Sequence, residues 1–293
     1  MALPSAPALL VPAKLTPPQL NPLWVERERL MACLNGPQAR LTLLVAPAGF
    51  GKSTLVTQWL TTLPGPVAWL NLDEHDQEPL RFLAYVAGAI TRVLPQALTM
   101  LQPLLTAHEP PPLYVFLQAL LVDLSALPDG LTLVLDDYHW VTAEPIHQAV
   151  AYLLRHLPPA CRLVILSRAD PPLTLARLRA EQQLAELRAA ELRFTYDEAQ
   201  AVVGSLLGPT VDRALVAALH EETEGWPIAL QLGALAWRDA PRAPSVSHGS
   251  DAIAEYLAEE VCERQPLPVQ QALLSLAVPE RVCADLTAIF GRS

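Results

Sequence analysis

The sequence lacks the features that mark several special classes of protein. Its cysteines, Cys33, Cys161, Cys262 and Cys283, stand far apart and form no Cys-x-x-Cys pair, which argues against a zinc site and a disulfide framework. No window of about 18 uncharged apolar residues occurs, so no membrane span is predicted. The apolar start, interrupted by prolines, has no basic residues ahead of it and is not typical of a secretion signal. We therefore expect a cytoplasmic chain with reduced, mostly buried thiols.

Positive charge is also scarce. The 293 residues include 20 lysines and arginines against 30 aspartates and glutamates, which gives a net charge of −10. Because the basic residues are scattered, no face of the protein is predicted to attract the phosphate backbone of nucleic acid. We expect no direct DNA binding by this chain. What the sequence does contain is apolar residues, 52% of the total, enough for the core of one large or two ordinary domains.

Short apolar runs alternate with helical patterns over the first two thirds of the chain. The runs occupy 41–46, 67–71, 131–135, 162–167 and, more weakly, 184–188. Four of these runs show little alternation of apolar and polar residues, as expected for strands that are buried on both faces. Helical spacing of large apolar residues separates them, at 53–62, 79–93 and 144–156. This order predicts an α/β fold with a parallel five-stranded sheet.

The two ends of the chain have a different character. Residues 1–22 are rich in proline and predict an extended, poorly ordered lead-in. After about 195 the strands cease and helical patterns dominate, at 197–207, 211–222 and 227–237. Residues 238–250 are small, polar and rich in proline, which is typical of a linker, and a last helical stretch follows.

The run at 41–46 leads into a glycine-containing turn with a helical pattern behind it. The turn has the lysine and hydroxyl residues of a phosphate-binding loop, but Ala46 stands where the strict pattern has glycine. In such a loop, N–H groups bind the β-phosphate, lysine reaches the β- and γ-phosphate oxygens, and serine or threonine holds Mg²⁺. An ordinary turn with a surface lysine is the alternative. The predicted nucleotide contacts are Ala48, Gly49, Phe50, Gly51, Lys52, Ser53 and Thr54.

Two adjacent carboxylates stand at the end of another predicted strand. Asp136 and Asp137 follow the run 131–135 directly. Because the carboxyl ends of parallel strands face one crevice in an open α/β sheet, we expect both acids near the loop. Asp136 would then hold Mg²⁺ together with Ser53, and Asp137 would polarise an attacking water. The alternative is that the acidic pair only caps the strand.

An arginine occupies the equivalent position after the next strand. Arg168 follows Ser167 at the end of the run 162–167. A guanidinium at this edge of the sheet would bind the γ-phosphate of ATP and so sense which nucleotide is present. In the alternative, Arg168 is a surface residue that pairs with Asp170. We assign Arg168 to the same predicted catalytic group as the two acids.

Several longer segments are similar to one family of proteins. They are VERERL (25–30), APAGFGKSTL (46–55), VAWLNLDEHDQEPLRFLAYV (67–86), LVLDDYHW (133–140), the stretch 163–199 and TEGWPIALQL (223–232). In this order they resemble the N-terminal portion of MalT-like regulators, which are large LuxR-type transcription activators of the STAND class of P-loop NTPases. The resemblance covers roughly residues 14–290. Members of this family often depart from glycine at the first loop position.

The resemblance implies further site residues and a switching mechanism. Val25, Arg27 and Arg29 would lie near the adenine and ribose, and Trp226 and Pro227 of the Gly-Trp-Pro motif would pack against the base from the helical lid. If the resemblance is set aside, the simpler interpretation of residues 25–29 is a solvated run of charges. The simpler interpretation of the Gly-Trp-Pro motif is a hinge with a tryptophan in the core. ADP would hold the module closed, whereas inducer and ATP would open it for self-association. Slow hydrolysis would then reset the switch.

The resemblance also implies an order of domains. A lead-in at 1–22 would precede a P-loop nucleotide-binding domain at 23–195, and a helical lid would follow at 196–240. A linker at 241–250 would then lead to the start of a winged-helix domain at 251–293. Such a chain is an ATP- and ADP-binding module, dependent on Mg²⁺, that lacks the sensor repeats for an inducer and the DNA-binding domain. The alternatives are a scaffold that retains nucleotide without turnover and a P-loop phosphotransferase, whose lid would need more arginines.

Overall fold

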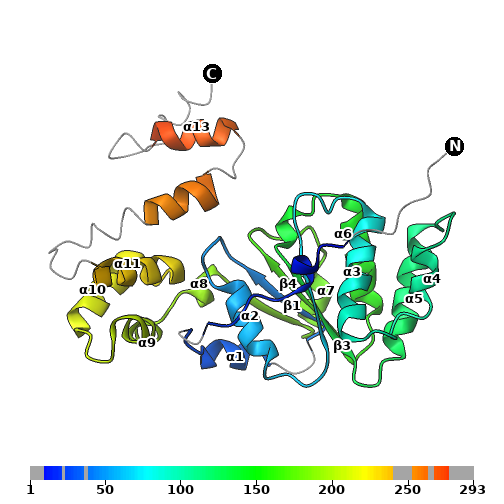
Figure 1. The fold of residues 1–293 in the computed structure, drawn as a ribbon, viewed down its shortest axis with the longest axis horizontal. Helices are drawn as coiled ribbons and strands as arrows, with labels where there is room; N and C mark the ends of the chain where they lie inside the picture. Colours follow the sequence, from blue (N-terminus) through cyan, green and yellow to red (C-terminus); the bar gives the residue numbers. More distant parts are fainter. Residues whose placement is uncertain (1–9, 22–23, 36–38, 240–252, 263–266, 277–293) are drawn as a thin grey trace. The chain divides into compact units, whose positions relative to one another are not determined.

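The computed structural model describes residues 10–21, 24–35, 39–239, 253–262 and 267–276 (Figure 1). The chain divides into two compact units, Met1–Arg193 and Phe194–Ser293. No helix in the described ranges has the length and apolar character needed to cross a membrane.

The first unit is built on a parallel five-stranded sheet with the strand order β2-β3-β4-β1-β5. Its strands are β1 Leu41–Val45, β2 Val67–Asn71, β3 Leu131–Asp136, β4 Cys161–Ser167 and β5 Leu184–Arg188. The predicted fold class is confirmed, including the weak fifth strand. Because all pairings are parallel, the carboxyl ends of the strands share one edge, where Val45 pairs with Ser167 and Asn71 with Asp136.

Helices cover both faces of this sheet. They are α1 Glu28–Leu34, α2 Lys52–Leu60, α3 Pro79–Val93, α4 Leu101–Leu105, α5 Leu113–Ser125, α6 Glu144–His156, α7 Ala176–Ala180 and α8 Ala189–Leu192. The helices predicted at 53–62, 79–93 and 144–156 correspond to α2, α3 and α6. No helix was predicted at α1, α4, α5, α7 or α8. The α5 sequence is apolar almost all round, so it carries little of the periodic signal by which a helix is recognised.

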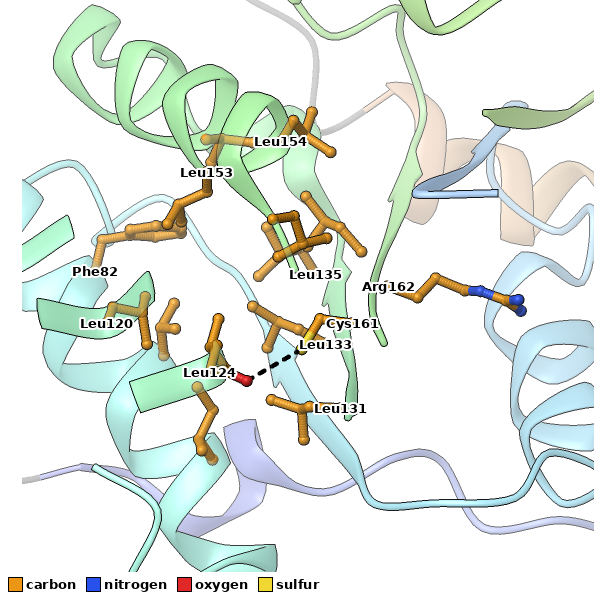
Figure 2. Close-up of a pocket in the computed structure, with 15 residues that line it drawn as sticks. Phe82, Leu120, Leu124, Leu131, Leu133, Leu135, Leu153, Leu154, Cys161 and Arg162 are labelled. Atoms are coloured by element: carbon orange, nitrogen blue, oxygen red, sulfur yellow. Dashed lines mark hydrogen bonds between the residues drawn. The ribbon is translucent and has the colours of Figure 1, made fainter. Parts of the chain in front are cut away.

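One face of the sheet packs against α3, α5 and α6. A void of about 20 Å³ lies in this core. Its lining includes Leu133 and Leu135 of β3, Phe82 of α3 and Leu153 of α6 (Figure 2). A void this small with an apolar lining is a packing feature rather than a ligand site. Cys161 at its wall is buried, as expected, whereas Cys33 on α1 is exposed.

Part of the lead-in at 1–22 is folded rather than extended. Pro12–Leu15 forms a short 3-10 helix, η1, that packs against β2 and α3. The ammonium group of Lys14 bonds to the buried carboxylate of Asp76, and the amide of Asn71 donates to the carbonyl of Thr16 over 3.1 Å. These contacts join residues more than fifty positions apart, so local sequence patterns did not reveal them.

The second unit is helical in its described part. Its helices are α9 Tyr196–Leu207, α10 Arg213–Thr223, α11 Pro227–Asp239, a helical stretch at 253–262 that ends in the π-helix Ala258–Cys262, and α13 Leu267–Leu276. The first three match the predicted helices. The turn before α11 requires Gly225, which has φ +72° and whose added Cβ would lie 2.5 Å from the carbonyl oxygen of Phe194. The winged-helix domain remains a prediction, and the linker at 241–250 lies outside the described residues.

Candidate functional site

The turn between β1 and α2 has the backbone of a tight loop. Gly49 and Gly51 adopt left-handed conformations with φ 74° and 73°, which glycine accepts without strain. Gly51 is the N-cap of α2, and an added Cβ there would contact nothing, so its backbone angle rather than space calls for glycine. Ala46 extends the pairing of β1, since its N–H donates to the carbonyl of Ser167 over 3.2 Å. Its buried methyl group fits, which explains why alanine is tolerated where the strict pattern has glycine.

Lys52, the first residue of α2, is folded back over the loop. Its Nζ donates to the carbonyl oxygens of Ala46 over 2.7 Å and of Pro47 over 2.9 Å, and the residue is only 7% exposed. Burial lowers its pKa to about 8. The negative charge of Asp137 opposes this shift, whereas the positive charge of Arg168 adds to it. The strand order β3-β4-β1 places the acids, Arg168 and the loop before Lys52 at neighbouring carboxyl ends of the sheet.

Ser53 lies in the first turn of α2, near Asp136 at the end of β3. The Asp136 carboxylate accepts the N–H of Asp137 over 2.9 Å, and the nearby Ser53 hydroxyl also favours its ionised form. Burial and the neighbouring charge of Asp137 raise the pKa of Asp136 to about 6, against the effects of these two groups and of Lys52. A serine hydroxyl beside a carboxylate is an oxygen pair of the kind that Mg²⁺ prefers, so these residues fit the predicted metal.

Asp137, the residue after Asp136, has an uncommon backbone conformation. It has φ 55° and ψ 38°, a left-handed conformation that is uncommon outside glycine and costs on the order of 1 kcal/mol. Its side chain is 41% exposed, and one carboxylate oxygen lies 3.7 Å from Nδ1 of His139. The conformation turns the chain sharply after β3 and leaves this carboxylate accessible while that of Asp136 is buried.

Arg168 stands at the end of β4 and is half-buried. Its predicted alternative partner, Asp170, forms an ion pair with Arg188 of β5 over 2.7 Å. Among the described residues, no cluster of three histidines, cysteines or acids could hold a metal on its own. A cation between Ser53 and Asp136 would therefore draw its remaining ligands from water or a bound phosphate.

Two basic residues at the start of α1, the N-cap Arg27 and Arg29 in the first turn, contact main-chain carbonyl groups. Arg27 is 5% exposed and donates to the carbonyls of Leu192 over 2.9 Å and Arg193 over 2.8 Å. Arg29 donates to Glu191 over 2.8 Å and to Arg193 over 2.6 Å. These bonds attach the start of α1 to the end of α8. They are not the solvated charge run of the simpler alternative, and a place near adenine and ribose stays a prediction.

The other residues assigned to the base are less informative. Val25 is half-buried in the first unit, and Pro227 is buried at the start of α11 in the second. Beside Pro227, the ring of Trp226 packs edge-on against Tyr256, with 6.1 Å between ring centres. Their contacts with a nucleotide therefore remain predictions.

Comparison with known proteins places this site in a family. An AAA ATPase domain model matches residues 25–166, which include the loop and both acids. The HTH-type transcriptional regulator MalT of Yersinia enterocolitica is 35% identical over 277 residues, which are 92% of this chain and 31% of that protein. The chain is a MalT-like P-loop NTPase. It spans about a third of the length of the curated regulators it matches.

Solved structures support the fold of this MalT-like chain. A Walker-type ATPase of Pyrococcus abyssi superimposes with a TM-score of 0.57 at 13% identity, over 90% of this chain and 87% of that one. A STAND protein with a tetratricopeptide repeat sensor, from Pyrococcus horikoshii, gives a TM-score of 0.54 at 14% identity, over 97% of this chain and 39% of that one. At such identities the likeness concerns the fold alone.

Proposed function

We propose that this chain is a regulatory switch module that binds ATP and ADP with Mg²⁺ and hydrolyses ATP slowly. One observation carries the proposal: Lys52 is folded back over the glycine loop after β1, while Asp136, Asp137 and Arg168 stand at the carboxyl ends of β3 and β4, at the same edge of the sheet. The family supports an NTPase regulatory module. The slow switch and the residue roles are our proposal.

Each residue has a distinct task in this proposal. The loop N–H groups and the N-terminus of α2 bind the β-phosphate, and Lys52 exchanges its two carbonyl partners for phosphate oxygens. Ser53 and Asp136 would hold Mg²⁺, which when bound neutralises phosphate charge. Asp137 orients and polarises the attacking water. Arg168 contacts the γ-phosphate, which is absent from ADP.

A switch requires that the nucleotides stabilise two states of the module unequally. A γ-phosphate contact supplies that difference, because only ATP can make it. We propose that ATP promotes self-association and that an inducer acts through a sensor beyond this chain. The chain itself, with its net charge of −10, should not bind duplex DNA. Adenine recognition by Val25, Arg27, Arg29 and Pro227 is part of the same proposal.

The central test separates binding from turnover. Lys52→Ala should weaken binding of a fluorescent ATP analogue by roughly tenfold to a hundredfold, because a charge-assisted hydrogen bond contributes about 1.5 to 3 kcal/mol. Asp137→Ala should retain binding and lose most Mg²⁺-dependent release of phosphate, since its contact with water matters mainly in the transition state. Equal binding by Lys52→Ala and the parent would disprove the nucleotide site.

The same measurements distinguish the alternatives. Tight binding by the parent without any Lys52-dependent phosphate release would indicate a scaffold that retains nucleotide. Phosphate transfer to an added small-molecule acceptor, in place of release to water, would indicate a phosphotransferase. The nucleotide that co-purifies with the chain would identify the base without an assumption about turnover.

A further inference from the structure

The turn that follows the acidic pair is held by one side chain from a distant loop. This turn, residues 137–143, connects β3 to α6 and begins at Asp137. Gln77 lies in the loop at 72–78 after β2, more than sixty positions earlier in the chain, and its carboxamide contacts the far end of the turn.

Both the amide nitrogen and the carbonyl oxygen of the Gln77 side chain form hydrogen bonds. Its Nε2 donates to the carbonyl of Trp140 over 2.6 Å, and to that of Glu74 over 3.2 Å. Its Oε1 accepts the N–H of Thr142 over 2.9 Å, the hydroxyl of Thr142 over 3.1 Å and the N–H of Ala143 over 3.2 Å. Ala143 is the N-cap of α6 and has no side chain that can cap a helix, so Gln77 binds main-chain groups where the helix begins.

The turn needs such support because it starts in a strained conformation. Asp137 adopts the left-handed region, which persists only where the surroundings impose it. The near end of the turn is held by a buried hydrogen bond of 2.9 Å between the Tyr138 hydroxyl and Nδ1 of His147. Gln77 holds the far end, so the turn is fixed on both sides of Trp140.

The loop that carries Gln77 is itself anchored. The N–H of Leu72 donates to the carbonyl of Asp136 over 3.0 Å, directly beside the acidic pair. The carboxylate of Asp76 is fully buried, accepts the N–H of Asp73 over 3.0 Å and bonds to the ammonium of Lys14. Gln77 therefore projects from a rigid loop, which lets its hydrogen bonds fix the turn.

We propose that Gln77 is a positioning residue for ATP hydrolysis, holding the turn so that the Asp137 carboxylate faces the nucleotide. The inference rests on the proposed function above. The Gln77 side chain contacts neither the phosphate-binding loop nor the two acids. Its removal should therefore affect turnover through Asp137 and leave the binding contacts of Lys52 in place. A lone glutamine in a loop carries no sequence pattern that would indicate such a role.

The test compares turnover with binding in the full 293-residue chain. Gln77→Leu should lower kcat for ATP hydrolysis roughly tenfold or more, as is typical when the support of a catalytic group is removed, and change the Kd for ATP less than about threefold. Gln77→Glu keeps the acceptor for Thr142 and Ala143 but loses the donor to Trp140, and should recover part of kcat. Amide exchange at Thr142 and Ala143 should accelerate in Gln77→Leu.

Gln148 of α6 provides the matched control. Its exposed side chain donates to Glu144 over 3.1 Å, and Gln148→Leu should leave turnover and binding unchanged. The inference is overturned if Gln77→Leu keeps the kcat of the parent. It is also overturned if kcat and ATP affinity fall in parallel together with the Tm. In both cases the proposed function stands. A parent with no Lys52-dependent turnover would instead overturn the proposed hydrolysis, and the inference with it.

Discussion

The two flanks of the candidate site are held by different kinds of contact. Beside Asp137, the polar anchors are buried: the Asp76 side chain is 0% exposed and that of Lys14 is 11% exposed. Beside Arg168, the neighbouring anchor is a surface ion pair, in which the side chains of Arg188 and Asp170 are 43% and 66% exposed. Each flank has an ion pair near an edge strand, β2 or β5, but only the pair near β2 is buried.

This difference has energetic consequences. Breaking a buried ion pair leaves a charge without solvent or partner, whereas a surface pair that is lost is replaced by water. We therefore expect the flank with the acids to be rigid and the loop after β4 to adjust at little cost. A rigid flank suits groups that must hold water and metal, and an adjustable one suits a group that responds to the γ-phosphate.

The largest expected effect comes from the buried flank. Lys14→Met should lower the free energy of unfolding by about 3 kcal/mol, because Asp76 would remain buried with only the more distant Arg81, at 3.6 Å, as a cationic partner. Urea denaturation of the variant and the parent measures this difference. Lys14→Arg, which retains the charge, should lose less, and a loss below about 1 kcal/mol in Lys14→Met would show that the two flanks do not differ.

An intermediate effect is expected at Arg168. Arg168→Ala should weaken ATP binding on the order of tenfold, because one charge-assisted hydrogen bond to the γ-phosphate is lost. ADP binding should change little, since ADP lacks that phosphate. Calorimetry measures the affinity of the variant and the parent for both nucleotides. If ATP and ADP affinity fall equally, Arg168 is a surface residue that does not contact the γ-phosphate.

The smallest effect is expected at the exposed flank. Asp170→Ala should change the free energy of unfolding by about 1 kcal/mol or less, since it removes only the exposed pair with Arg188 and leaves the contact of Arg188 with Glu186 in place. The hydrogen bond from Arg188 lowers the pKa of Asp170, so any contribution of the pair is present above the ordinary aspartate pKa of about 3.9 and is lost as the pH falls through the lowered pKa. Urea denaturation of the parent and the variant at pH 7 and pH 3 tests both the size and the pH dependence of this contribution. A large loss in the free energy of unfolding at pH 7 would show that the two flanks do not differ.

Much of the fold could be predicted because its signals are local. Each strand is a short apolar run, and α3 and α6 show helical spacing with an apolar and a polar face. The α5 helix escaped prediction because it has no clear polar face, and η1 because its contacts join distant segments. Nothing in the spacing of residues revealed that Arg27 and Arg29 contact the carbonyls at the end of α8.

The sequence by itself determined the loop and the polar ends of the strands, because Asp136 ends β3, Arg168 follows β4 and Lys52 stands behind the loop after β1, and parallel strands end at one edge. The tertiary structure alone decided how those groups are supported. Hydrogen bonds from Gln77 to the turn after β3 and from Lys14 to Asp76 span more than sixty residues of chain. Contacts at such separations leave no periodic pattern, because only the packing of the folded chain brings their partners together.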